Sequence, residues 1–192
     1  AASSNDCLSI KHIERAKSEF ANAKYCLIQL EIPQPTVRAA LSLSKSQGVF
    51  NILDPAPCRR LSKSLLRLVD IITPNEFELA ELTDMPVKTK RNIECAGEKL
   101  LQTGVGEVIV TCGERGVCHL SGDGADWFSA PKVKAIDTVG AGDCFNGSLA
   151  SALSRDLGMD EAIRFAVLTS ASAVTIRGVQ PSFPELKPRN CY

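Results

Sequence analysis

The stretch Asp137-Thr-Val-Gly-Ala-Gly-Asp143 places a glycine-rich turn directly before a predicted helix over residues 143–155. Apolar residues recur along that helix at a spacing that keeps one of its sides inward. The backbone N–H groups of a first helical turn have no partner inside the helix, and they lie at the positive end of its dipole. Because Gly140, Ala141 and Gly142 are small, an anion can approach these N–H groups closely. The turn is therefore predicted to hold a phosphoryl group.

Two carboxylates flank this turn. Asp137 and Asp143 lie on either side of the glycines, so both can face one pocket, where one positions a hydroxyl group and the other accepts its proton. An acidic residue in a first helical turn is also favoured by the dipole alone, and for Asp143 in isolation the two interpretations have equal weight. Phosphoryl transfer repeatedly uses a carboxylate beside the acceptor hydroxyl. The pairing with Asp137 favours the role of general base for Asp143.

The rest of the chain predicts an α/β fold. Short apolar runs alternate with amphipathic segments, which is typical of repeated βα units and a largely parallel sheet. No internal repeat or long linker interrupts the pattern, so one domain is expected over residues 1–192. We predict strands at 25–30, 49–53, 69–72 and 107–111, antiparallel strands at 117–120, 127–128 and 132–134, and helices over 10–20, 35–47, 76–83, 90–103, 143–155 and 160–176.

Composition excludes several classes of partner. Lys plus Arg equals Asp plus Glu at 22 each, so no net field attracts nucleic acid, and a small-molecule ligand is expected. The eight cysteines form no CxxC pair and lie partly in apolar runs, which indicates free thiols and a reducing, cytoplasmic compartment. His12 and His119 have no carboxylate or cysteine at suggestive spacing, so no zinc site is expected. No apolar stretch is long enough to span a membrane.

Polar residues follow each strand that we predict to be parallel. In open α/β sheets, ligands bind in the crevice outside the carboxyl ends of the strands. These sets are therefore expected to converge on one site. They are Gln29 and Glu31, Asp54, Asn75 and Glu78, and Thr111 and Gly113.

In this order the motifs resemble the ribokinase (PfkB) carbohydrate-kinase family, and residues 137–143 resemble its second signature. The resemblance covers about residues 21–184 and implies a three-layer α/β fold with a mainly parallel sheet flanked by helices. Complete members begin with further strands and a Gly-Gly first signature, and they carry a small β-sheet lid. The sequence lacks these, so we expect the C-terminal two-thirds of such a fold. The other matching motifs are Gln29-Leu-Glu31, Asp54-Pro-Ala-Pro57, Ile72-Thr-Pro-Asn-Glu-Phe-Glu78, Thr111-Cys-Gly-Glu-Arg-Gly116 and Arg177-Gly-Val-Gln-Pro-Ser182.

The resemblance implies an ATP-dependent kinase whose complete form phosphorylates D-ribose to D-ribose 5-phosphate and is a homodimer. Asp143 is then the general base, and the backbone N–H groups of residues 140–143, including Gly140, Ala141 and Gly142, form the anion hole. Glu31 and Asp137 are expected to bind the sugar. Two alternatives stay open, namely another sugar or nucleoside kinase of the family, such as a fructokinase-like enzyme, and a truncated, non-catalytic ATP-binding module.

The resemblance also implies the ligands of ATP and two metal ions. Asn75 and Glu78 match the NxxE motif, which organises Mg²⁺ largely through water, although the same spacing predicts a helix capping box. A tight turn after a strand would equally explain the glycines at 113 and 116. The expected nucleotide-binding residues are Asn75, Thr111, Gly113, Glu114, Gly116 and Gly142, and those expected around K⁺ are Asp137, Val139, Ala173, Ile176, Gly178 and Ser182.

Overall fold

The computed structural model describes residues 4–184. It divides into two compact units, Ala1–Phe128 and Ser129–Tyr192. Every strand among the described residues belongs to the first unit, whereas the regular elements of the second unit are helices. The predicted α/β class is confirmed, and a single domain over residues 1–192 stays a prediction.

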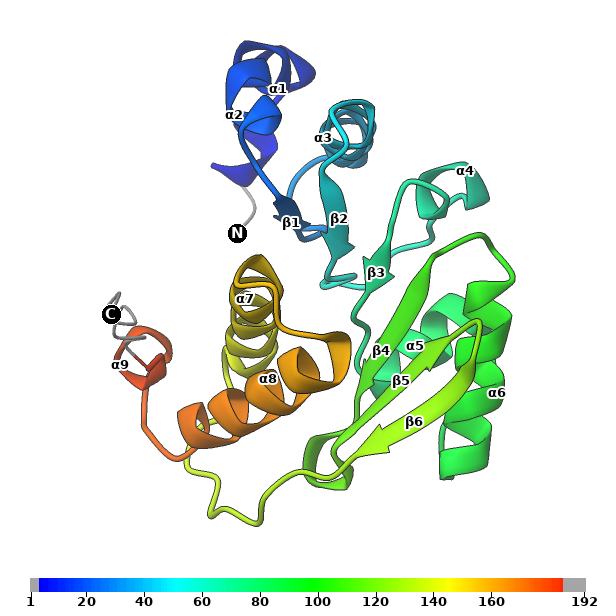
Figure 1. Ribbon diagram of the computed structural model, residues 1–192, viewed down its shortest axis with the longest axis vertical. Helices are drawn as coiled ribbons and strands as arrows, with labels where there is room; N and C mark the ends of the chain where they lie inside the picture. The colour runs from blue at the N-terminus through cyan, green and yellow to red at the C-terminus, as the bar shows by residue number, and fades with distance from the viewer. Residues whose placement is uncertain (1–3, 185–192) are drawn as a thin grey trace. The chain divides into compact units, whose positions relative to one another are not determined.

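The first unit is built on a six-stranded sheet in the order β1-β2-β3-β4-β5-β6 (Figure 1). The first four strands are parallel and the last three form an antiparallel meander, with β4 common to both parts. A tight turn at Gly122 and Asp123 joins the last two strands, because Ser121 pairs with Gly124. The strands are β1 (Tyr25–Ile28), β2 (Phe50–Leu53), β3 (Ile71–Ile72), β4 (Glu107–Thr111), β5 (Val117–Ser121) and β6 (Gly124–Phe128).

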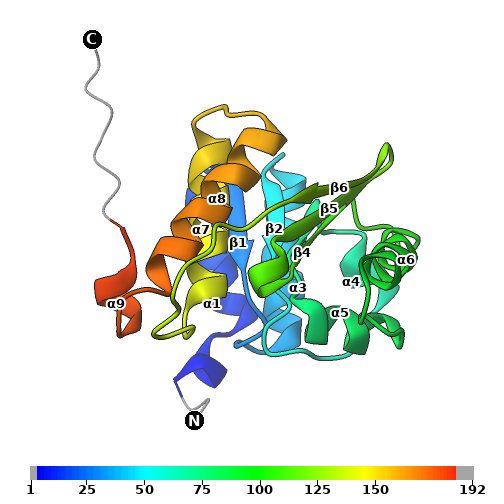
Figure 2. The ribbon, with the colours of Figure 1, turned by 90° about the horizontal axis from the view of Figure 1, so that it is seen from below.

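One apolar core joins the third to sixth helices of this unit to the sheet. Leu41 of the third helix, Leu53 of β2 and Ile93 of the sixth helix are all fully buried in it. Burying one such side chain contributes about 1.5–3 kcal/mol. Figure 2 shows the sixth helix beside strands β4 to β6. The helices are α1 (Ile10–Arg15), α2 (Lys17–Ala21), α3 (Gln34–Ser46), α4 (Lys63–Leu66), α5 (Glu76–Thr83) and α6 (Lys90–Leu101), with short 3-10 turns η1 (Asn5–Cys7) and η2 (Gly113–Arg115).

The continuous helix predicted over residues 10–20 is wrong, because Ala16 interrupts it with φ −86° and ψ 13°. Neither α1 nor α2 contains a buried residue. Short helices that bury no face are only marginally stable, so nothing in the packing requires one unbroken helix here.

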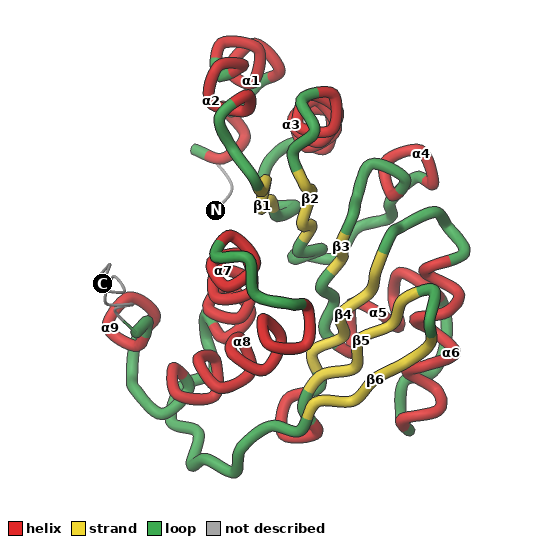
Figure 3. Tube along the Cα trace, in the orientation of Figure 1, coloured by secondary structure: helices red, strands yellow, loops and turns green. Residues whose placement is uncertain are grey.

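The second unit consists of α7 (Ala141–Ser154), α8 (Met159–Ala173) and α9 (Val179–Ser182). α7 and α8 pack against each other, and the apolar side predicted for α7 is buried at Phe145 and Leu149. The strand predicted at 132–134 is wrong, since these residues are drawn as loop in Figure 3. All three residues are exposed, so their alternating pattern has no face to bury.

Other expectations are settled within residues 4–184. None of the described helices has the length and apolar character needed to cross a bilayer. Seven cysteines in this part of the chain are thiols outside any disulfide, as predicted, whereas Cys191 lies outside the described residues. His119 has a carboxylate partner that its sequence spacing did not reveal, because its Nε2 lies 2.6 Å from Oε2 of Glu107.

Candidate functional site

The glycine turn before α7 depends on one left-handed residue. Gly140 is the N-cap of the helix, with φ 79° and ψ 4°, a conformation that costs little only for glycine. Because this residue turns the chain sharply, α7 begins at Ala141. The predicted start at residue 143 is therefore two residues late. The turn thus brings Ala141, Gly142 and Asp143 together as the first three residues of the helix.

The backbone groups of this first turn are not equivalent. The N–H of Ala141 donates to the carbonyl of Thr138 at 3.2 Å, so it already has an acceptor within the turn. Gly142 is exposed, and nothing lies within 4 Å of the place where a Cβ would stand. An anion can therefore approach the backbone at Gly142. Asp143, the third helical residue, is exposed at the same helix start.

Asp137 fastens the turn to the segment after α8. Its Oδ1 accepts a hydrogen bond from the N–H of Val139 at 3.1 Å, and its Oδ2 accepts one from the N–H of Gly178 at 3.0 Å. These bonds, first that from Gly178 and then that from Val139, lower the pKa of Asp137, and the charge of Arg177 adds to the effect. Three residues of the predicted K⁺ set are thereby brought together.

The rest of the predicted K⁺ set lies in the same segment. Backbone bonds from Ile136 and Asp137 to the carbonyl of Val174, at 2.7 and 3.1 Å, join the turn to the end of α8. Ala173 is the buried last residue of that helix and Ile176 is exposed. The buried Ser182 donates its hydroxyl to the carbonyl of Val179 at 2.7 Å. Among residues 4–184, no group of three or more His, Cys, Asp or Glu side chains is placed to hold a metal ion.

In the first unit, Asn75 and Glu78 form the predicted capping box of α5. The N–H of Asn75 donates to Oε2 of Glu78 at 2.8 Å, and the N–H of Glu78 donates to Oδ1 of Asn75 at 2.9 Å. Burial raises the pKa of Glu78, and the negative charges of Asp54 and Glu81 raise it further against the lowering effect of its bond from Asn75. The structural interpretation of this pair is confirmed, and its metal role stays a prediction.

The loop after β4 is a tight glycine turn. Gly113 and Gly116 have φ angles of 54° and 91°, and Cys112 closes the turn by donating its N–H to the carbonyl of Gly116 at 2.8 Å. The side chain of Glu114 is exposed. Thr111 donates its N–H to the carbonyl of Pro74 at 3.0 Å. The predicted nucleotide loop therefore starts beside the capping box.

Contacts run along the carboxyl edge of the sheet, as predicted. Gln29, after β1, donates to Asp54, after β2, with 3.3 Å between Nε2 and Oδ2. The charge of Asp54 acts on Glu78, after β3, and Asn75 forms an isolated bridge with Thr111 at the end of β4. The predicted gathering of strand ends is therefore confirmed within the first unit.

Glu31 occupies an exposed bend beyond β1, and sequence reasoning missed its partner. Its Oε2 accepts a hydrogen bond from Nδ2 of Asn5 at 3.3 Å. The two residues are far apart in sequence and Asn5 belongs to no recognised motif, so no sequence signal connects them. The predicted sugar ligand is thus already part of a polar contact.

This chain is similar to known proteins over nearly its whole length. Residues 2–186 match the pfkB family of carbohydrate kinases. A deoxyribokinase from Salmonella typhi is 36% identical over 189 residues, which make up 98% of this chain and 62% of that protein. This chain therefore spans less than two thirds of the length of that relative.

Two solved structures extend the likeness to the fold. A ribokinase from Arabidopsis thaliana, complexed with ribose and ATP, has a TM-score of 0.86 and 32% identity, and the match covers 90% of this chain and 56% of that one. A ribokinase II from E. coli in complex with ATP and Mg²⁺ has a TM-score of 0.76 and 26% identity, with coverages of 92% and 60%. The predicted ribokinase-like fold class is confirmed.

Proposed function

Because this chain belongs to the pfkB family of carbohydrate kinases, we propose that it supplies the nucleotide-binding and catalytic part of an ATP-dependent sugar kinase. The complete enzyme transfers the γ-phosphoryl group of ATP to the primary hydroxyl of D-ribose and releases D-ribose 5-phosphate and ADP. One observation carries the proposal. The left-handed Gly140 makes Gly142 and Asp143 residues of the first turn of α7, which unites an anion-binding backbone with a carboxylate.

In the proposed reaction Asp143 takes the proton of the sugar hydroxyl while the oxygen of that hydroxyl attacks the γ-phosphorus. The backbone N–H groups at the start of α7 stabilise the negative charge on the γ-phosphoryl oxygens. Asp137 and Glu31 bind other hydroxyls of the sugar. Since the oxygens of Asp137 already accept two backbone hydrogen bonds, its carboxylate is held in a fixed orientation.

The first unit contributes nucleotide and metal ligands. The glycines of the loop over residues 111–116 let ATP approach the backbone, and Asn75 and Glu78 hold Mg²⁺ through water, which suits an ion that keeps much of its hydration shell. Both ligands are supported by the relatives, because the Arabidopsis structure contains ATP and the E. coli structure contains ATP and Mg²⁺. K⁺ held near Asp137 and Gly178, a cytoplasmic location and a homodimer stay predictions.

A second candidate substrate is 2-deoxy-D-ribose. The deoxyribokinase from Salmonella typhi is 36% identical to this chain, and the Arabidopsis ribokinase, whose structure contains ribose, is 32% identical. The two sugars differ by one hydroxyl group. A site that hydrogen-bonds this hydroxyl would reject the deoxy sugar strongly, because its own polar groups would be left unpaired.

The test is a coupled assay of ADP release by the complete protein with D-ribose, 2-deoxy-D-ribose, D-fructose or adenosine as acceptor. We expect D-ribose to give the highest kcat/KM, and we expect the rate to require Mg²⁺ and to rise with K⁺. A higher kcat/KM for another acceptor would reassign the substrate. ATP binding without turnover of any acceptor would favour the non-catalytic module.

A further inference from the structure

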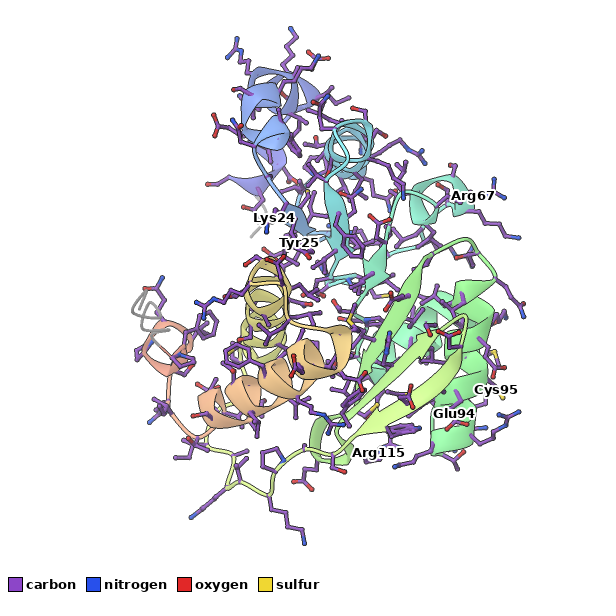
Figure 4. All side chains as sticks on the ribbon, viewed as in Figure 1. Lys24, Tyr25, Arg67, Glu94, Cys95 and Arg115 are labelled. Atoms are coloured by element: carbon purple, nitrogen blue, oxygen red, sulfur yellow. The ribbon has the colours of Figure 1, made fainter. Side chains whose placement is uncertain are left out.

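An ion pair joins the loop over residues 111–116 to the motif over residues 75–78. The sequence motifs give no sign of this pair. Arg115 lies in η2, inside the loop over residues 111–116, and its guanidinium forms an ion pair with the carboxylate of Glu76. Glu76 is the first residue of α5 and directly follows Asn75. Figure 4 marks Arg115 in the short turn between β4 and β5. The pair therefore connects the nucleotide loop to the segment proposed to hold Mg²⁺.

Arg115 makes a second contact, with the segment directly before α6. Its Nη1 donates to the carbonyl of Lys88 at 3.1 Å, and Lys88 directly precedes Thr89, the N-cap of α6. A planar guanidinium can hold two acceptors in fixed directions, which the single ammonium of a lysine does less well. One side chain thus ties the loop to the beginnings of two helices.

The two motifs are also fastened at their other end. Thr111 donates its N–H to the carbonyl of Pro74 at 3.0 Å and forms an isolated bridge with Asn75. Between the two fastenings, the left-handed Gly113 and Gly116 let the chain turn, but glycine loses much conformational freedom when it is ordered. The shape of the loop therefore depends on contacts such as that of Arg115.

We propose that Arg115 and Glu76 are positioning residues that couple the metal segment, residues 75–78, to the nucleotide loop, residues 111–116. This inference rests on the proposed function. A loop already ordered loses less freedom when the nucleotide binds, so preorganisation raises affinity. A metal ion that orders the metal segment also orders the loop through this ion pair and so strengthens nucleotide binding. Because coupling between sites is reciprocal, the nucleotide strengthens metal binding by the same factor.

If the ion pair served folding stability alone, its removal would lower the unfolding midpoint and leave the affinity for nucleotide unchanged. The side chains of Arg115 and Glu76 are 38% and 22% exposed, and ion pairs near the surface contribute little to folding stability. Removing the pair is therefore expected to leave the unfolding midpoint almost unchanged. Its effect should instead appear in the affinity for nucleotide, and it should depend on Mg²⁺.

The experiment measures ADP binding to the complete protein by calorimetry, in Mg²⁺ and in EDTA. In Mg²⁺ we expect Arg115→Gln and Glu76→Gln each to raise the Kd for ADP by about five-fold or more. The double variant should bind no more weakly than Arg115→Gln, since Glu76→Gln removes only a contact that Arg115→Gln has already removed. In EDTA the increase should be smaller, because no metal ion links the two motifs.

Arg91→Gln is the matched control. Arg91 lies on α6 with its side chain 73% exposed and pairs with Glu94 at 3.6 Å, so the substitution removes the same charge without touching the loop. Its Kd for ADP should equal that of the unaltered protein. Arg115→Lys keeps the charge but not the two-acceptor geometry, and an intermediate Kd is expected. In the complete enzyme, Arg115→Gln should raise the KM for ATP and leave the KM for the sugar unchanged.

Three results would overturn the coupling. They are an unchanged Kd for ADP in Arg115→Gln, an equal increase in Mg²⁺ and in EDTA, and additive effects in the double variant. If the unaltered protein does not bind ADP, the proposed function fails and the coupling fails with it. If the unaltered protein binds ADP and Arg115→Gln binds it equally well, only the coupling fails.

Discussion

The carboxylate of Asp137 accepts a hydrogen bond from the backbone N–H of Gly178, with 3.0 Å between Oδ2 and the nitrogen. The second oxygen accepts a bond from Val139 at 3.1 Å. One side chain therefore holds the turn before α7 against the segment after α8. Both bonds need acceptor oxygens, and they are strongest when the carboxylate is ionised.

The first prediction concerns acid titration of this contact. Because the pKa of Asp137 is lowered in the folded protein, its stabilising contribution is fully present above the ordinary carboxyl pKa of about 3.9. The contribution is lost as the pH falls through the lower folded value. In an NMR titration, the amide signal of Gly178 should keep its position to below that ordinary value. Titration at or above it would contradict the prediction, and Asp137→Asn should remove the pH dependence.

The second prediction concerns the left-handed N-cap of α7. Gly140→Ala should destabilise the protein by about 1–2 kcal/mol, since the left-handed conformation disfavours a Cβ. An added Cβ would also stand 2.6 Å from Cγ1 of Val179. Gly140→Asn should cost less, because asparagine tolerates this conformation. Urea unfolding measures each difference.

Gly142→Ala is the matched control for that measurement. Gly142 lies inside α7 and has open space around it, and replacing a helical glycine by alanine stabilises by up to about 0.5–1 kcal/mol. A loss of stability as large as that of Gly140→Ala would show that small size, and not backbone conformation, is required across the turn.

The third prediction separates the two roles of Asn75. Asn75→Ala should destabilise by about 0.5–2 kcal/mol because the cap is lost. Asn75→Ser should retain nearly full stability, since serine is an equally good N-cap. If Asn75 also orders the water around Mg²⁺, Asn75→Ser should still need more Mg²⁺ for half-maximal activity. An unchanged Mg²⁺ requirement would leave Asn75 with the cap alone.

The fourth prediction concerns thiol reactivity. Burial is the main cause that raises the pKa of Cys112 and of Cys118 to about 12, and only the thiolate attacks an alkylating reagent. At neutral pH, iodoacetamide should therefore label the exposed Cys7 first and should reach the other two only in urea. Peptide mass spectrometry measures the order, and rapid labelling of Cys112 in the folded protein would contradict it.

The features that sequence predicted well are those set by neighbours in the chain. The spacing of Asn75 and Glu78 predicted their capping box, which needs only one helical turn. The apolar period of α7 predicted its buried side. In both cases short-range geometry leaves few other solutions. Where no buried face selects a structure, as at 132–134, the same kind of pattern predicted a strand that does not form.

The contacts that sequence did not predict join distant segments through the pairing of strands. His119 lies opposite Ile109, and Glu107 stands two residues before Ile109 in β4, on the same face. The Oε2 atom of Glu107 therefore lies 2.6 Å from Nε2 of His119. The pair of Arg115 and Glu76 likewise exists only because β3 and β4 are neighbours. The order of the strands had to be known before either contact was visible.

The last prediction tests Asp143 as the general base. Asp143→Asn keeps the size of the side chain but removes its ability to accept a proton, so the rate of sugar phosphorylation should fall by about 10²–10⁴-fold. Asp160→Asn is the matched control, since Asp160 is an acidic residue in the first turn of α8 and loses the same favourable interaction with a helix dipole. Both variants should unfold at nearly the same urea concentration, and only the first should lose activity. Equal turnover by Asp143→Asn and the unaltered enzyme would remove the base assignment, and equal losses in both variants would trace the effect to helix stability.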